Sequence, residues 1–269
     1  MKILSKFYVG IIYAFLYLPI AVLIVFSFND AKSRTVFTDF TFKWYEKLFT
    51  NDIILGAFAN TLFVALVAGI GAVVLGTFAA IGINAMNKKL QSLLLNVTYL
   101  PMINPDIITG VSLMLLFVFI RMELGFTSLI LAHITFNVPI VIFNVLPKLR
   151  QLDKNVYNAA LDLGCNPSQA FRKVILPEIM PGIAAGFLLS ITYSFDDFAV
   201  SFFTSAADSQ TLSVAIYSMV RMKVSPEINA LSTIMFVVVL LVLLIVNIYG
   251  AKKEKKIKQR NILKGEIDV

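Results

Sequence analysis

Long apolar runs separated by short polar segments dominate the pattern of hydrophobic and polar positions along the chain. A helix needs about 20 consecutive apolar residues to cross a bilayer. Runs of about this length lie at Phe7–Phe28, Ile53–Met86, Ile103–Ile120, Phe126–Leu146, Pro181–Phe203 and Ile228–Gly250. The pattern therefore predicts an all-α, polytopic membrane protein with six transmembrane helices.

The third run contains prolines at its start, Pro101 and Pro105. Proline is tolerated in the first turn of a helix, so we expect this helix to enter the membrane near Pro105. The preceding segment Leu90–Tyr99 is expected to lie along the membrane interface or to enter at a slant. The first run, Phe7–Phe28, is too long for a signal peptide and no cleavage motif follows it, so we predict a retained span.

The composition agrees with a membrane protein. Hydrophobic residues make up 58% of the 269 residues and charged residues only 14%, whereas soluble domains carry about 25% charged residues. The mean hydropathy is +0.84. The chain has one cysteine, Cys165, which excludes an intramolecular disulfide.

Lys and Arg residues concentrate in alternate loops. They occur near the N-terminus, at Lys88 and Lys89, in the loop at 148–180 and in the basic tail at 251–269, whereas the other loops mix both signs. Short loops rich in Lys and Arg remain in the cytoplasm. We therefore expect both termini to be cytoplasmic, and the basic tail to be an orientation signal rather than a nucleic-acid or lipid site.

The long cytoplasmic loop at 148–180 is predicted to form two short helices. The first runs from about Asp153 to Leu163, and Gly164 is expected to cap its C-terminus. Asn166 is expected to cap the second helix. Pro167 at the first helical position and Gln169 three residues after the cap complete this start, and Pro177 and Pro181 are expected to end the helix. Such a hairpin suits docking by another protein or, alternatively, rests on lipid head groups.

The segment "NAALDLGCNPSQAFRKVILP" resembles the EAA signature of binding-protein-dependent ABC importer permeases. That signature reads Glu-Ala-Ala, three residues, Gly, nine residues, Ile, any residue, Leu-Pro. The matching residues are Ala159, Ala160, Gly164, Leu176 and Pro177, Val174 stands for the Ile, and Asn158 replaces the Glu. The resemblance implies a coupling helix that enters a cleft on an ATP-hydrolysing subunit, without any ion pair that the Glu would make.

Further segments are similar to spermidine/putrescine permeases of the PotC type, namely "YLPIAVLIVFSFN", "NPDIITGVSLM", "HITFNVPIVI", "SFDDFAVSFF" and "VSPEINALSTI". The resemblance implies one permease domain over residues 1–269, with a core at about 53–250, and the MetI-like fold of type I ABC importers in a bacterial inner membrane. It also implies two cytoplasmic ABC ATPase subunits, a second related permease and an external polyamine-binding protein as partners, and no nucleic acid.

Motifs of enzymes are missing from the sequence. There is no G-x-x-x-x-G-K-[ST] phosphate-binding loop, so we expect ATP and Mg²⁺ to be bound by the partner ATPase rather than by this chain. There is also no H-E-x-x-H, no G-x-S-x-G and no set of Cys or His ligands, so no catalytic residue, metal or cofactor is expected. The lone His133 is expected to be a hydrogen-bond partner between helices.

Two adjacent carboxylates, Asp196 and Asp197, lie inside the fifth apolar run. At about 1.5 Å per residue, Asp196 lies roughly 22 Å beyond Pro181, past the middle of the membrane. A carboxylate that faces lipid is costly, so both should face the bundle interior or a water-filled cavity. Neighbouring helical residues point about 100° apart. Both can therefore face one cavity only if it is wide or the helix is locally opened. Alternatively, one of them caps or braces a neighbouring helix.

Aromatic and hydroxyl side chains surround this pair: Thr192, Tyr193, Phe195, Phe198 and Phe202. Aromatic rings present a negative face to ammonium groups. Acids that alternate with apolar patches suit a polyamine, which carries ammonium groups on a methylene chain. The residues thus favour a cation pathway, and a structural bridge to another helix is the alternative.

Two further acids are candidates for the pathway. Asp106 follows Pro105, where disturbed backbone hydrogen bonding could open a pathway, but it also suits the first turn of a helix, stabilised by the helix dipole. Glu227 follows Ser225 and Pro226 and fits a helix start equally well.

A permease with weak guiding acids is the predicted function, with the segments Asn29–Asp52 and Ser205–Val224 as places where the binding protein docks. Three alternatives remain at this point. They are an ABC permease for another solute such as a cationic amino acid, iron or an anion, a secondary transporter or channel that uses the Asp pair, and a scaffold without transport.

Overall fold

The computed structural model describes residues 2–31, 36–222, 226–238 and 240–241. Most of them are helical, and they contain no β-strand beyond one isolated bridge between Asn29 and Phe40. The chain divides into two compact units, Asp52–Ser218 and Met1–Asn51 with Met219–Val269. The all-α prediction is confirmed.

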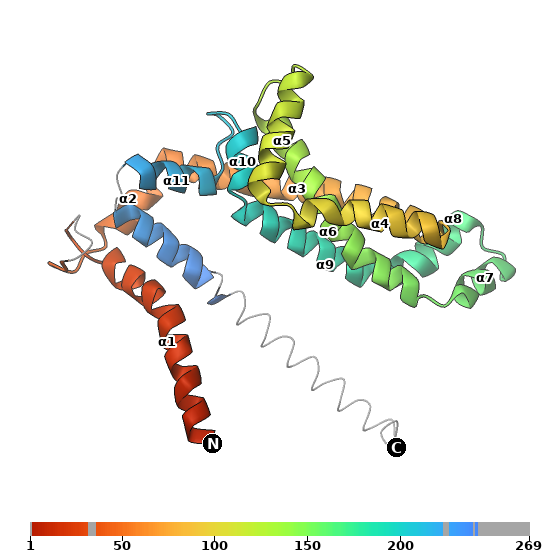
Figure 1. Cartoon of the computed structure of the whole chain (residues 1–269), viewed down its shortest axis with the longest axis horizontal. Coiled ribbons are helices and arrows are strands. Elements are labelled where there is room, and N and C mark those ends of the chain that lie inside the picture. The colour runs from red at the N-terminus through yellow and green to blue at the C-terminus, as the bar shows by residue number, and fades with distance from the viewer. Residues whose placement is uncertain (1, 32–35, 223–225, 239, 242–269) are drawn as a thin grey trace. The chain divides into compact units, whose positions relative to one another are not determined.

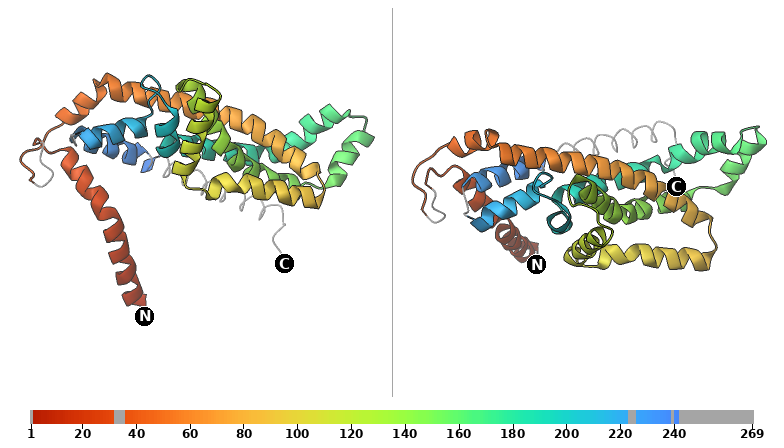
Figure 2. Two further views of the ribbon diagram at one scale, coloured as in Figure 1. Left: turned by 45° about the horizontal axis from the view of Figure 1, so that its top comes forward. Right: turned by 90° about the horizontal axis from the view of Figure 1, so that it is seen from above.

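Three long helices form the core of the larger unit: α3 (Asp52–Ala85), α6 (Phe126–Gln151) and α9 (Leu176–Asp196). They lie side by side (Figures 1 and 2). Glycines allow their backbones to approach, because a Cβ at Gly76 would lie 2.7 Å from Val141 Cβ and one at Gly186 would lie 3.1 Å from Val141 Cα. Small residues at such contacts are typical of packed membrane helices.

The third predicted span is broken. Helix α4 (Lys88–Ile103) and helix α5 (Asp106–Phe119) meet at an angle of 103°. The residue before a proline avoids helical backbone angles, so the Asn104–Pro105 step separates the two helices. Helix α5 begins next to Pro105, where the helix start was predicted, and Leu90–Tyr99 belongs to the separate α4. The position of α4 relative to the membrane stays a prediction.

The fifth predicted span, Pro181–Phe203, is also broken. Helix α9 ends at Asp196, Asp197 has extended backbone angles (φ −64°, ψ 124°), and α10 covers Ala199–Thr204. The locally opened helix, one of the two arrangements predicted for the Asp pair, is therefore the one that forms. Helix α11 (Leu212–Met222) follows, and Thr61 Oγ1 on α3 accepts a hydrogen bond from Leu212 N at 2.7 Å.

The predicted helix starts in the long loop are confirmed. Helix α7 covers Lys154–Asp162 with Asp153 as its N-cap, and Gly164 has a left-handed φ of +87°. Helix α8 (Pro167–Ala170) begins with a capping box in which Asn166 Oδ1 accepts from Gln169 N at 2.8 Å and Gln169 Oε1 accepts from Asn166 N at 3.1 Å. Local polar contacts therefore decide this geometry.

The prediction that Pro177 and Pro181 end the second helix of this loop is wrong. Helix α8 continues through a π-helical segment, η1 (Phe171–Ile175), directly into α9, which contains both prolines. Pro177 lies in the first turn of α9, where its missing N–H is tolerated. In the π-helical segment before it, Leu176 N donates to Phe171 O, five residues earlier, which is the wider π-type turn.

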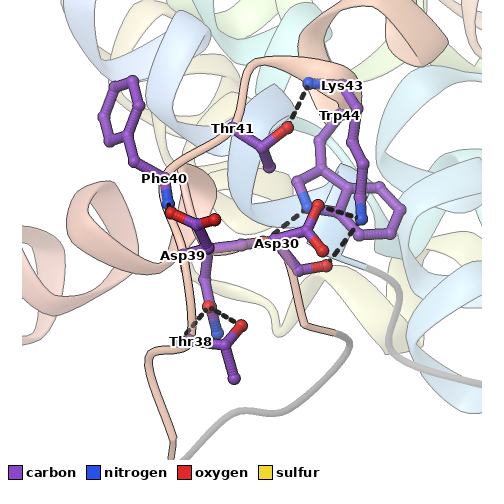
Figure 3. A network of polar contacts seen from close by, with 8 residues as sticks. Asp30, Thr38, Asp39, Phe40, Thr41, Lys43 and Trp44 are labelled. Atoms are coloured by element: carbon purple, nitrogen blue, oxygen red, sulfur yellow. Dashed lines mark hydrogen bonds and ion pairs between the residues drawn. The ribbon is translucent and has the colours of Figure 1, made fainter.

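The smaller unit contains α1 (Lys2–Ser27), α2 (Lys43–Phe49) and a helix at Pro226–Val238. A polar network organises the segment between α1 and α2 (Figure 3). Lys43 forms an ion pair with Asp30, and Trp44 Nε1 donates to Asn29 O at 2.7 Å.

Four helices of the described residues are long and apolar enough to span a membrane, and the bent pair α4–α5 can supply a fifth. Of the predicted sixth span, Ile228–Gly250, the part up to Val238 is helical. Most of its remainder lies outside the described residues.

Candidate functional site

A cavity of about 500 Å³ lies where the two helix breaks of the larger unit meet. Helix α5 packs against α10 beside it (Figure 1). Its walls come from α4, α5, α6, α9 and α10. The lining residues are Pro101, Met102, Asp106, Thr109, Phe136, Ile140, Thr192, Tyr193, Asp196, Asp197, Phe198, Ala199 and Val200. Four of the five predicted pathway residues, Asp106, Tyr193, Asp196 and Asp197, therefore line one cavity.

Two of the three carboxylates in this cavity are open. Asp106 and Asp196 are exposed, and neither has a hydrogen-bond or ion-pair partner among the described residues. Unpaired, exposed carboxylates attract cations. These two acids therefore give the cavity its negative character.

Asp197 differs from its neighbour in its contacts. Its carboxylate accepts hydrogen bonds from Val200 N at 3.2 Å, Ser201 N at 2.7 Å and Ser201 Oγ at 2.7 Å. It therefore caps the start of α10, where helical N–H groups lack backbone partners. Asp197 lines the cavity, but its oxygens are already committed to the protein.

Aromatic residues form the apolar part of the wall. The Phe198 ring lies 4.6 Å from the Tyr217 ring and 5.5 Å from the Phe202 ring. The side chain of Tyr193 is more than half exposed. Phe195 instead packs on Phe58, so it does not line the cavity, and neither does Phe202.

Two helix C-termini also meet the cavity. Pro101 and Met102 lie in the last turn of α4, and Tyr193 and Asp196 lie in the last turn of α9. The last carbonyl groups of a helix have no intrahelical partner and carry a partial negative charge. Backbone and side chains therefore both favour a cation here.

Some lining residues were not among the sequence-predicted candidates. Thr109 lies three residues after Asp106 on α5, and Phe136 and Ile140 lie four apart on α6. These spacings place each pair on one helix face. The spacing was visible in the sequence, but it does not distinguish a face that lines a cavity from one that faces lipid.

Glu227 belongs to the smaller unit and does not line the cavity. Its side chain, 4% exposed, forms an ion pair with Lys47 of α2, and Asn51 Nδ2 lies 3.4 Å from its Oε2. The contacts give Glu227 a role in joining α2 to the helix Pro226–Val238.

His133 lies fully buried on α6, and its Nε2 lies 3.0 Å from Ser201 Oγ on α10. The prediction of a hydrogen bond between helices is confirmed. Within the residues that the structure describes, no group of His, Cys, Asp or Glu has an arrangement that could hold a metal ion.

The residues of the predicted coupling signature lie at one end of the larger unit (Figure 1). Asn158 and Ala159 on α7 are exposed, as is Pro177 on α9, whereas Ala160 is buried. An apolar side chain beside the turn, Leu163, is 86% exposed. This end therefore presents apolar atoms and a fixed turn to the surroundings.

Comparison with known proteins identifies the family. Residues 72–259 match the family model of the binding-protein-dependent transport system inner membrane component. The chain belongs to this family. It is therefore a multi-pass permease component of the inner membrane.

Two relatives from Escherichia coli (strain K12) are similar over most of their length. The permease is 37% identical to the spermidine/putrescine transport system permease protein PotC over 254 residues, 94% of this chain and 96% of the relative. It is 37% identical to the putrescine transport system permease protein PotI over 230 residues, 82% of each chain.

Solved structures share the fold of the permease. A chain from a bacterial ABC transporter that imports the acidic polysaccharide alginate matches with a TM-score of 0.71 and 15% identity, over 92% of this chain and 95% of that one. A chain from an amino acid ABC transporter crystallised with histidines matches with a TM-score of 0.57 and 17% identity, over 78% of this chain and 98% of that one. The fold is therefore that of ABC importer permeases.

Proposed function

We propose that this permease is a membrane-spanning subunit of an ATP-driven importer of polyamines, spermidine or putrescine. The observation that carries the proposal is the pair of open carboxylates, Asp106 and Asp196, in a cavity with aromatic walls at two helix breaks. Relatives with 37% identity are named as permeases for these solutes.

The chemistry of the cavity suits a linear polyamine. Ammonium groups pair with carboxylates and with the carbonyl ends of α4 and α9. The methylene chain between them contacts Met102, Phe136 and Phe198, and Tyr193 offers a ring face to a cation. Asp197, whose carboxylate already accepts three hydrogen bonds from α10, shapes the site rather than binding the cation directly. An anion is disfavoured by the same charges.

The two exposed carboxylates should bind a cation only weakly. Both open carboxylates are exposed, and interactions between exposed charges are screened by water and salt. A tight site would slow release into the cytoplasm, whereas an open one lets the cation pass. Preference between spermidine and putrescine is then set mostly by the external binding protein.

In this proposal, partner subunits supply the energy for transport by hydrolysing ATP. Two cytoplasmic ATPase subunits bind ATP and Mg²⁺ and push the loop that contains Asn158, Ala159, Ala160, Gly164, Leu176 and Pro177. A second related permease completes the pathway, and both termini of this chain lie in the cytoplasm. The external binding protein docks on Asn29–Asp52 and Ser205–Val224. Among the described residues of the first segment, Lys43 pairs with Asp30 and Trp44 Nε1 donates to Asn29 O (Figure 3).

Uptake of labelled spermidine tests the proposal. Cells without polyamine importers would express this chain with its three kinds of partner, unaltered or with Asp196→Asn or Asp106→Asn. We expect uptake by the unaltered complex, and a loss of up to about fivefold in each variant, because an exposed ion pair contributes about 0.2–1 kcal/mol. Thr135→Ala is the matched control and should leave uptake unchanged, because Thr135 is exposed on α6, does not line the cavity and bonds only its own backbone.

Uptake is compared only between complexes whose protein levels and assembly equal those of the unaltered complex. An assembled complex without any polyamine uptake would refute the substrate class. Normal uptake by both Asn variants would refute the guiding role of the two acids.

A further inference from the structure

Two polar side chains of α6 hold both sides of the break between α9 and α10. His133 Nε2 contacts Ser201 Oγ, beyond the break, and Asn137 Nδ2 donates to Ser194 Oγ at 2.7 Å, before it. His133 and Asn137 are four residues apart and share one face of the helix. We propose that they are positioning residues, which fix the opening of the break and thereby direct Asp196 into the cavity.

Burial makes this α6 clamp, consisting of His133, Asn137, Ser194 and Ser201, a strict constraint. All four side chains are at most 1% exposed. His133 Nδ1 and Asn137 Oδ1 have no hydrogen-bond partner among the described residues, so each side chain makes only its one hydrogen bond across the break. Breaking either contact would leave buried polar atoms unsatisfied, which costs more than the bond itself contributes.

The proton arrangement links the clamp to the Asp pair. Ser201 Oγ donates its one proton to Asp197 Oδ2 at 2.7 Å. It can then only accept from His133, so Nε2 is the protonated ring nitrogen. Asp197, Ser201 and His133 thus form one chain of hydrogen bonds from the break to α6.

The residues of the break do not themselves fix the direction of α10 relative to α9. The carboxylate of Asp197 bonds Val200 and Ser201, both on α10. These bonds cap α10 without tying it to α9. A continuous helix that contacts both halves therefore determines their relative direction, and α6 is that helix.

The clamp also reaches the second open acid. A Cβ at Gly110 of α5 would lie 3.0 Å from Ala199 O and 3.1 Å from Val200 Cα, so α5 packs closely on α10. Asp106 lies one turn before Gly110. The direction of α10 therefore fixes Asp106 as well, and the clamp sets the spacing of the two acids. What these acids bind rests on the proposed function.

Accessibility of position 196 tests the clamp without any substrate. The assembled complex would carry Cys165→Ser and Asp196→Cys, and a small cationic methanethiosulfonate would modify the new thiol. The modification rate would be measured on this chain by mass spectrometry. The compared variants are His133→Leu, Asn137→Leu, His133→Gln, which keeps an N–H near the position of Nε2, and Thr135→Ala. Thr135 is exposed on the same helix and bonds only its own backbone.

We expect the two Leu variants to change the rate by about fivefold or more, since a buried hydrogen bond contributes about 1 kcal/mol. The Gln and Ala variants should keep the parent rate. Equal rates in all variants would overturn the proposal. If the Leu variants do not assemble, the modification rate of the milder variant Ser201→Ala is compared with the parent rate by the same criterion. If Ser201→Ala does not assemble either, these contacts serve folding alone, and the proposal is overturned.

The ratio of spermidine to putrescine uptake distinguishes a positioning role of the clamp from a purely stabilising one. With the binding protein unchanged, a shifted acid spacing should alter the ratio of maximal spermidine to putrescine uptake in the Leu variants, and His133→Gln should restore it. A fall of both rates by one factor would indicate fewer complexes only and would contradict the proposal. If the parent transports no polyamine, the proposed function fails, while the thiol rates still decide the clamp.

Discussion

At the scale of single residues, the adjacent carboxylates of the helix break have different surroundings. Asp197 accepts three hydrogen bonds from α10, whereas Asp196 is exposed and has no partner among the described residues. Side-chain caps of this kind contribute about 0.5–2 kcal/mol. The two residues should therefore respond differently to substitution.

We expect Asp197→Ala to lower the thermal midpoint of the purified complex. Asp197→Asn should lower it less, because one amide oxygen can still accept from Ser201, although the amide NH2 group cannot accept from Val200 N. Asp196→Asn should leave the midpoint unchanged while it lowers uptake. Thermal unfolding of the three variants, followed by fluorescence, measures this. A midpoint that falls as far in Asp196→Asn as in Asp197→Ala would show that both acids are structural.

At the scale of elements, the contact of α5 with α10 depends on a glycine. A Cβ at Gly110 would meet two backbone atoms of α10, at 3.0 and 3.1 Å. Backbone cannot yield as a flexible side chain can. Gly110→Ala should therefore destabilise the complex by about 1–3 kcal/mol, the usual range for overpacking.

Gly82→Ala on α3 is the matched control, because nothing lies within 4 Å of its added Cβ. This control should be neutral or slightly stabilising, since alanine favours helix by about 1 kcal/mol over glycine. Denaturation midpoints compare the two variants. A neutral Gly110→Ala would mean that α5 moves freely against α10.

The turn between α7 and α8 depends on another glycine. Gly164 has a φ of +87°, a conformation that asparagine tolerates and β-branched residues avoid. We expect Gly164→Val to reduce ATP hydrolysis stimulated by the loaded binding protein, because strain of roughly 1–2 kcal/mol displaces the turn. Gly164→Asn should retain stimulation. Equal stimulation in both variants would show that the conformation of this turn does not affect coupling to the ATPase.

Local chemistry explains which elements the sequence could predict. Asn166 and Gln169 cap each other within one turn, so their geometry follows from spacing. Pro177 misled the prediction, because proline usually ends a helix. Here the π-helical segment before it accommodates the ring, and such segments have no pattern of their own.

The candidate site could be predicted only in part. Asp106 and Asp196 were each identifiable, since a carboxylate in an apolar run needs a purpose. Their meeting depends on the contact of Gly110 with α10 and on two polar contacts from α6, which no local pattern encodes. The partnership of Glu227 with Lys47 is likewise a long-range contact, which its helix-start sequence does not indicate.

At the scale of the larger unit, one helix connects the coupling end to the cavity. Helix α9 begins at Leu176, directly after the π-helical segment of the loop, and ends at Asp196 in the cavity wall. Over its 21 residues, a rise of about 1.5 Å per residue spans roughly 30 Å. A displacement of the loop can therefore reach the acids through a continuous helix.

This connection predicts that ATP, and not an ion gradient, drives transport. In proteoliposomes that contain the whole complex, ionophores should leave spermidine uptake unchanged while ATP is held constant. A hydrolysis-deficient ATPase partner should abolish uptake, because nothing then displaces the loop. A secondary transporter would respond in the opposite way, since its intramembrane carboxylates would couple to protons or Na⁺. Uptake that collapses with the gradient, or that occurs with this chain alone, would therefore contradict coupling through α9.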